Sequence, residues 1–327
     1  NTTGSQNVGV GASALDANTT ASDNVAVGYL CMENNTTGAH HAALGAFALQ
    51  SNTTGDENTA FGKSALGYNE TGNKNTAVGR SALSANLASE NTGVGYKTLL
   101  ANTTGTRNTA LGAWALDSNT TANNNTAIGY DALAANTTGA DNTSVGAYAL
   151  DANTTASNNC ALGKSALSGN TTGSENTALG TSALLANTTA DNNTAVGYNA
   201  LLSNTTGAGH VAVGKQALKD CTTANSNTAV GQLAASALTT GWACVAIGDQ
   251  AMGAGVVTGN SNNAVGYQAG ENLTTGSNNN FFGTYAGEET TTGEYNCAIG
   301  QEALEVNTTG SANIAIGFRA LEANTTA

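Results

Sequence analysis

Apolar and polar residues follow one short pattern that returns along this chain about every 17 residues. The pattern is clearest in residues 193–208, which read N-T-A-V-G-Y-N-A-L-L-S-N-T-T-G-A. A fixed period over a whole chain is typical of a solenoid, in which each coil buries its apolar side only against its neighbours. We therefore expect residues 1–327 to form one continuous all-β solenoid, or β-roll, of about nineteen 17-residue coils.

One glycine, here called the anchor glycine, fixes the position of each coil. It recurs nineteen times, as Gly11, Gly28, Gly45, Gly62, Gly79, Gly95, Gly112, Gly129, Gly146, Gly163, Gly180, Gly197, Gly214, Gly231, Gly248, Gly266, Gly283, Gly300 and Gly317. The residues before it, N-T-A-V, alternate and include β-branched side chains, which predicts a strand. The Ala-Leu pair after it breaks the alternation, so we expect a bend or a single helical turn that points both side chains into the core.

The Asn-Thr-Thr-Gly segment that follows predicts a turn, because asparagine and glycine favour turn conformations. Its last residue is glycine in some coils and alanine in others, for example Gly38 and Ala21. A positive φ is therefore not expected to be compulsory there. One short coil near residues 86–89 and one long coil near residues 253–260 change length in this turn, where insertions disturb the strands least.

The strand is small or apolar on both faces. The residue directly before the anchor glycine is apolar in every copy, while alanine or glycine usually fills the place before that. A strand that is apolar on both faces is covered on both faces. The leucines of the chain itself can cover one face, and we expect a second copy of the chain to cover the other.

The strand letters also carry a family resemblance. N-T-A-V-G and N-T-A-I-G, at residues 193–197 and 125–129, resemble the N-S-V-A-I-G repeats in the head domains of trimeric autotransporter adhesins. The whole unit resembles the repeats of phage-type tail-fibre proteins that end in a self-cleaving chaperone domain. This resemblance implies a left-handed β-roll, three chains around the fibre axis and an extracellular location on a cell or virion surface. The adhesin repeat is shorter, and no neck, stalk or chaperone segment is evident here.

Composition agrees with a fibre segment. Only 9% of the residues are charged, the net charge is −13 and proline is absent, so we do not expect nucleic acid as a partner. The sequence shows neither an apolar run of about 18 residues nor a basic leader, so we expect no membrane insertion. Both ends fall inside a repeat and are uncapped, which predicts a piece of a longer fibre or a protomer that stacks end to end.

Polar chemistry is repeated along the chain rather than focused at one place. Asparagine stands four residues before the anchor glycine in 16 of 19 copies, and this first asparagine column predicts an amide ladder. His41, His210 and Cys244 are its exceptions. His40 and His41 have no further ligands at metal-site spacing, so we expect no metal and no cofactor. The cysteines share no column in adjacent coils, which disfavours disulfides.

Three other functions can be weighed from the residues. Acidic residues are scattered and only three histidines occur, so we expect no enzyme. Thirteen Asn-Thr-Thr sequons would place glycans about 4.8 Å apart, which favours a turn motif, with sparse glycosylation as the alternative. The threonine columns suggest ice binding, but adjacent threonines in an extended segment point opposite ways and leave a single outward row.

Aromatic residues provide the candidate contact site. Ten of the sixteen lie one or two residues after an anchor glycine, as Tyr29, Phe47, Tyr96, Trp114, Tyr130, Tyr148, Tyr198, Tyr267, Tyr285 and Phe318. Such rings can stack on sugars or seal contacts between protomers, and we favour the second. We therefore expect the shaft of an extracellular or virion-borne fibre that displays a distal adhesive tip. Adhesion along the shaft to a glycan or cell-surface receptor, and ice binding, are the alternatives.

Overall fold

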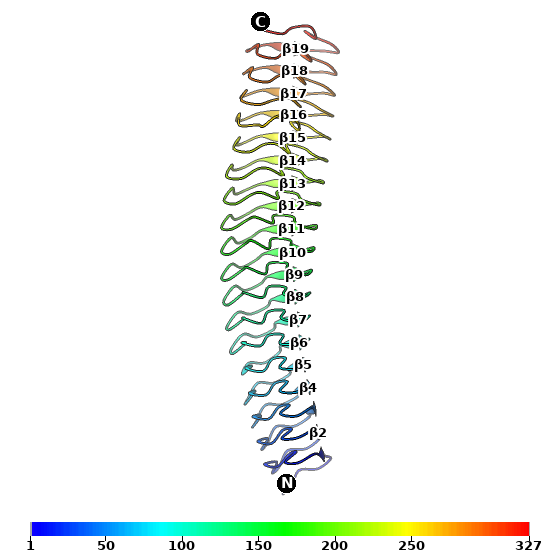
Figure 1. The fold of residues 1–327 in the computed structure, drawn as a ribbon, viewed down its shortest axis with the longest axis vertical. Helices are drawn as coiled ribbons and strands as arrows, with labels where there is room; N and C mark the ends of the chain where they lie inside the picture. Colours follow the sequence, from blue (N-terminus) through cyan, green and yellow to red (C-terminus); the bar gives the residue numbers. More distant parts are fainter. Residues whose placement is uncertain (1, 327) are drawn as a thin grey trace. The chain divides into compact units, whose positions relative to one another are not determined.

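The computed structural model describes residues 2–326, which fall into two compact units, residues 2–159 and 160–326. Within each unit the coils stack on one another, and every coil adds one three-residue strand to a parallel sheet (Figure 1). The all-β solenoid of about nineteen coils is thus confirmed. Between residues 2 and 326 there is no α-helix, and hence none with the length and apolarity needed to cross a membrane.

The strands recur at the predicted place before each anchor glycine. The first unit contains β1 (Val8–Val10), β2 (Val25–Val27), β3 (Ala42–Leu44), β4 (Thr59–Phe61), β5 (Thr76–Val78), β6 (Thr92–Val94), β7 (Thr109–Leu111), β8 (Thr126–Ile128) and β9 (Thr143–Val145). The second contains β10 (Cys160–Leu162), β11 (Thr177–Leu179), β12 (Thr194–Val196), β13 (Val211–Val213), β14 (Thr228–Val230), β15 (Val245–Ile247), β16 (Asn263–Val265), β17 (Asn280–Phe282), β18 (Cys297–Ile299) and β19 (Ile314–Ile316).

Strand register is kept even where a coil changes length. Thr59 pairs with Thr76, seventeen positions later, whereas Thr76 pairs with Thr92 across the short coil. Val245 pairs with Asn263 across the long coil. The missing and extra residues are therefore absorbed in the turns, as the sequence predicted.

Each strand turns one residue inward and two outward. In β7 the middle residue, Ala110, is fully buried, while Thr109 and Leu111 are exposed. This follows from the period of two along a strand. The alanine is small because the leucines of the Ala-Leu bend fill the interior opposite it, and Leu116 is fully buried. The inward face is covered by the chain itself, while the outward face is open in both units.

The Ala-Leu bend points both side chains inward without forming a helical turn. Trp114 and Leu116 have positive φ angles of 57° and 52°, on either side of the buried Ala115. The left-handed conformation costs about 1–2 kcal/mol per residue. It also aims the N–H groups of these two residues along the stack: Trp114 donates to the Tyr96 carbonyl of the preceding coil, and Leu116 to the Ala132 carbonyl of the next. These bonds to both neighbouring coils offset the strain.

The anchor glycine is required by both conformation and space. Its φ lies between 121° and 144° in the nineteen copies. A Cβ atom on Gly112 would lie only 2.3 Å from the carbonyl oxygen of Gly129 in the next coil, so a side chain would separate the coils. By contrast, the glycines that end the Asn-Thr-Thr-Gly turn, such as Gly38 and Gly105, do not have positive φ. This agrees with the alanines found at the same place in other coils.

Candidate functional site

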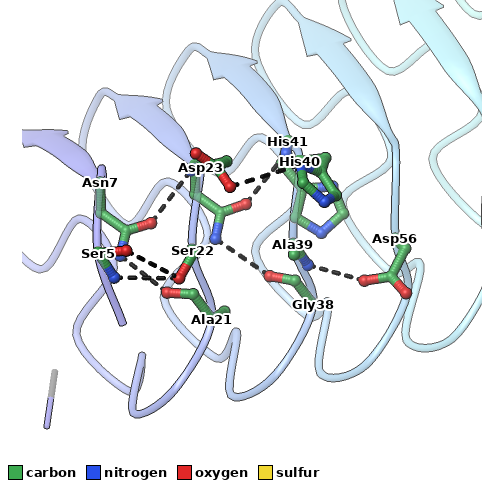
Figure 2. Close-up of polar contacts among 11 residues, drawn as sticks. Ser5, Asn7, Ala21, Ser22, Asp23, Gly38, Ala39, His40, His41 and Asp56 are labelled. Atoms are coloured by element: carbon green, nitrogen blue, oxygen red, sulfur yellow. Dashed lines mark hydrogen bonds and ion pairs between the residues drawn. The ribbon is translucent and has the colours of Figure 1, made fainter. Parts of the chain in front are cut away.

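The first asparagine column forms the predicted ladder inside the molecule. The Oδ1 atom of Asn7 accepts a hydrogen bond from the backbone N–H of Asn24 at 3.1 Å, and the Nδ2 atom of Asn24 donates to the Gly38 carbonyl (Figure 2). Most rungs run from side chain to backbone in this way. The ladder therefore ties each strand start to the next coil and to the turn beside it.

A second asparagine column, the asparagine of the Asn-Thr-Thr turn, forms a ladder that the sequence interpretation missed. The Nδ2 atom of Asn52 donates to Oδ1 of Asn35 at 2.8 Å, and Asn119 donates to Asn102 at 2.8 Å. These amides are fully buried. The signal was present, because asparagine fills this place in 14 of 19 coils. Asparagine at this place also favours a local turn, and the sequence alone does not separate the two roles.

Burial of the second asparagine column bears on the sequons. The Nδ2 atom that would carry a glycan lies inside the core and donates hydrogen bonds, for example from Asn136 to Oδ1 of Asn119 and to the Gly139 carbonyl. A glycan at this atom would break the ladder and open the coil. The folded chain therefore favours the interpretation of Asn-Thr-Thr as a turn motif.

Two histidines replace asparagine in the first column without breaking it. The Nδ1 atom of His210 accepts from the backbone N–H of Asn227 at 3.2 Å, and its Nε2–H donates to the Ala224 carbonyl at 2.7 Å. His41, labelled in Figure 2, accepts from the Asn58 N–H in the same way. The neutral imidazole thus reproduces the acceptor and donor of the amide. Burial lowers the pKa of both histidines below the usual 6.5.

The five cysteines are free thiols, and the two that share a column, Cys160 and Cys297, lie far apart in strands β10 and β18. Cys31, Cys221 and Cys244 are buried, and burial raises the pKa of Cys31 to about 11 and that of Cys221 to about 12. Thiols with such high pKa values are poor nucleophiles. They fill the space of small neutral residues.

One group of carboxylates lies together in the described part of the chain. Glu302, Glu305 and Glu322 offer oxygens within 4.8 Å of one another. Arg319 binds Glu302 and lies 3.7 Å from Glu322, and its hydrogen bond lowers the pKa of Glu302. The guanidinium already occupies an oxygen of Glu302 and offsets part of the charge of the cluster, and acidic groups of this kind are common without an ion, so we assign no metal to it.

The predicted aromatic row is real but divided into three groups. Tyr96, Trp114, Tyr130 and Tyr148 form one continuous stack with ring centroids 5.2–5.4 Å apart. Tyr29 contacts Phe47 and Tyr267 contacts Tyr285, each at 5.5 Å. Tyr198 and Phe318 are exposed and make no ring contact within residues 2–326.

The orientation of the rings limits what the row can bind. Successive rings meet edge to face, at interplanar angles of 68–86°. This is a favoured geometry for ring pairs, worth about 0.5–1.5 kcal/mol per pair. It does not give a flat platform, because neighbouring ring faces point in nearly perpendicular directions. The row stabilises the coil edge and is unsuited to hold one extended sugar chain.

An exposed surface without charged residues runs along the outward face of each sheet, here called the sheet face. It consists of the residues on both sides of each inward alanine, such as Thr109 and Leu111. The apolar column directly before the anchor glycine runs through it, with Leu44 50% exposed and Leu111 48% exposed. No residue on the sheet face is charged in any coil, and the 22 acidic and 9 basic residues all lie elsewhere. Contiguous exposed apolar surface of this kind marks an interaction site.

Comparison of the chain with protein-family models, with curated proteins and with solved structures gave no match. The fold and the surfaces described above therefore carry the functional argument alone.

Proposed function

We propose that the chain is the repetitive shaft of an extracellular or virion-borne fibre, built from several copies that meet through their sheet faces and that display an adhesive tip elsewhere in the assembly. The observation that carries this proposal is the uncharged column of the sheet face directly before the anchor glycine, which is apolar and exposed or partly exposed in all nineteen coils. Burial of apolar surface contributes about 25 cal/mol per Å². A row repeated once per coil therefore offers an interface that grows with every repeat.

A second copy of the chain is the partner that best fits this face. The net charge of −13 would oppose association of identical chains if the charges met at the interface. Because the sheet face has no charged residue, copies can approach through it without like-charge contacts. Three copies is the number that the adhesin and tail-fibre resemblance implies, and it is the number we propose.

Ice binding is the rival that the threonines raise. In the Asn-Thr-Thr turn, the hydroxyl of the first threonine donates a hydrogen bond to the next coil. Thr36 Oγ1, for example, donates to the Thr53 carbonyl at 2.9 Å. The second, such as Thr37, is exposed and forms one outward row. On the sheet face, threonine fills only nine of nineteen places. One free row and an incomplete second row support a shaft better than an ice-binding array.

Charged substitutions on the sheet face test the proposal. We expect the triple variant Val94→Glu, Leu111→Glu and Ile128→Glu to weaken assembly, because three carboxylates would face an apolar partner surface. The matched control is Thr104→Glu, Thr121→Glu and Thr138→Glu, which places the same charges on exposed turns of the same unit. Light scattering should show a lower mass for the first variant only. Equal masses for the two variants would remove the sheet face as the interface.

A further inference from the structure

A cleft interrupts the surface of the first unit where the aromatic row is broken. It has a volume of about 350 Å³ and is lined by Phe47, Gln50, Ser64, Tyr68, Ser81 and Ser84. The row stops after Phe47 because Ser64 and Ser81 occupy the corresponding places of the next two coils. Gly67, which also borders the cleft, has no side chain to fill it. The volume lies at the low end of the ~300–1,000 Å³ typical of small-molecule sites.

The lining carries hydroxyl groups that the protein does not use. The side chains of Ser64, Ser81 and Ser84 make no hydrogen bond to any residue in the described range. Ser84 is only 8% exposed. The three hydroxyl oxygens are not among the buried unsatisfied atoms of residues 2–326, so water reaches them in the cleft. A polar ligand rich in hydroxyls can replace this water with direct hydrogen bonds on entering the cleft.

Two rings complete the cleft. Tyr68 is 65% exposed and leaves its ring open to a ligand. Phe47 is held from the other side by its edge-to-face contact with Tyr29. None of the lining residues is charged, although the Lys63 ammonium lies 5.9 Å from the Phe47 ring centroid at the rim. Apolar rings combined with a few placed polar groups are typical of small-molecule sites.

We infer that this cleft is a binding site for a short, neutral saccharide of one or two pyranose rings. The C–H face of a sugar packs against the Tyr68 ring, while its hydroxyls bond to Ser64, Ser81 and Ser84. The site lies on the turns that follow the anchor glycines and not on the sheet face, so assembly through the sheet face leaves it open. The inference does not rest on the fibre role.

The test uses the full chain and named probes. Lactose, maltose, cellobiose and N,N′-diacetylchitobiose serve as neutral disaccharides, and 3′-sialyllactose serves as an anionic comparison, in titrations followed by NMR. We expect saturable binding of at least one neutral disaccharide in the millimolar range. Tyr68→Ala should weaken that binding about tenfold. Tyr295→Ala, which removes an equally exposed tyrosine from the other unit, should leave it unchanged.

A second variant closes the cleft without removing a ring. Ser81→Leu places a leucine in a column that already accepts Leu30 and Leu233, so the fold should be kept while the cleft is filled. Binding should be lost in this variant, with unfolding curves confirming the native state. Absence of binding for all four neutral probes, binding of 3′-sialyllactose alone, or equal binding by the Tyr68→Ala and Tyr295→Ala variants would each overturn the inference.

Discussion

The first unit and the middle of the second unit fill the same interior place with different chemistry. In the first unit, the second asparagine column is unbroken, with a hydrogen bond from each amide to the preceding one, from Asn35 to Asn153. In five successive coils of the second unit, the column instead holds Cys221, Leu238, Val257, Leu273 and Thr290. All five are buried. Coil stacking therefore does not depend on the second asparagine ladder at every level, although the first ladder continues through these coils.

In the apolar coils, a larger side chain in the second asparagine column is offset by a smaller one in the Ala-Leu bend, so the total core volume is kept. Where leucine enters the second asparagine column, the leucine of the Ala-Leu bend is replaced by a smaller residue, as Ala235 is beside Leu238 and Gly270 is beside Leu273. Phe281 fills the space next to Gly270 and Gly287, where an added Cβ would lie 2.8 and 2.6 Å from its ring. Close packing thus constrains the summed volume of neighbouring side chains more than the volume of any single one.

Where the second asparagine column changes from amides to other residues, buried polar atoms are left without hydrogen-bond partners. Two buried side-chain atoms lack a hydrogen-bond partner within residues 2–326, Asn204 Oδ1 and Thr290 Oγ1. Asn204 precedes Cys221 in the column, and Thr290 is the last of the five replacements. An amide ladder that stops leaves an unpaired group at its end. Long runs of one chemistry reduce the number of such ends.

The largest effect is expected at Phe281, where the apolar coils depend on one ring. Phe281→Ala should destabilise the second unit by about 3–5 kcal/mol, because a cavity opens beside two glycines. Gly287→Leu alone should also destabilise, by collision with the ring. The double variant should recover part of the loss, since leucine accepts the φ of 61° at Gly287, as it does elsewhere in this column. Urea unfolding of the two single variants and the double variant measures the three free-energy losses. A double-variant loss equal to the sum of the single losses would contradict the exchange of volume between the two columns.

A smaller effect is expected when the intact ladder of the first unit receives a leucine. Asn119→Leu should cost about 2–4 kcal/mol, because it leaves Oδ1 of Asn102 without its donor, removes one of the two hydrogen bonds of Asn136 Nδ2 and crowds Leu116. Adding Leu116→Ala imitates the Ala235 and Leu238 pair and should relieve the crowding only. Urea unfolding of the single and double variants separates these two contributions. A single variant as stable as the native chain would show that the ladder contributes nothing.

The two histidines of the first asparagine column should make the free energy of unfolding depend on pH in both units. His210 is neutral in its ladder position, and burial lowers its pKa in the folded state. Below about 6.5 the unfolded chain binds the proton more readily, so the free energy of unfolding should fall as the pH drops from 6.5 towards the folded pKa. His41 should add to this effect in the first unit. Replacing both histidines with asparagine should flatten the pH dependence in this range, and an unchanged slope would contradict the ladder assignment.

The smallest effect concerns the aromatic row. Tyr130 has a ring on each side at 5.2 and 5.4 Å, whereas Tyr198, in the same column, has no ring neighbour in the described chain. Tyr130→Ala should therefore destabilise more than Tyr198→Ala, by about 0.5–1.5 kcal/mol per lost ring pair. Thermal unfolding of the two variants checks this difference. Equal losses would show that the ring contacts add nothing beyond surface burial.

Periodicity alone was enough to predict the coil, the strand before each anchor glycine and the buried Ala-Leu pair. The first asparagine ladder was also predicted, because asparagine in a strand position has few local uses. The second ladder was missed, because the same Asn-Thr-Thr letters satisfy a local turn. The alternating φ signs around Ala115 were hidden for another reason: tryptophan and leucine do not favour positive φ, and only bonds to neighbouring coils hold them there.

Side-chain orientation accounts for what else was missed. The sequence placed Phe47 and Tyr96 in one row but gave no sign that Ser64 and Ser81 open a cleft between them. The sequence also did not show that the rings meet edge to face. The rings lie in two columns, one or two residues after the anchor glycine, and these columns come together only when the coils stack. Such features depend on distances between coils, which a repeat pattern does not contain.

The most direct test of the account is the native mass of the purified chain. Analytical ultracentrifugation should return about three times the 32.2 kDa chain mass, because the proposed shaft buries the uncharged sheet face between three copies. A folded, protease-resistant species that sediments as a single 32.2 kDa chain at all concentrations would contradict the proposal that this face joins the copies of a fibre shaft.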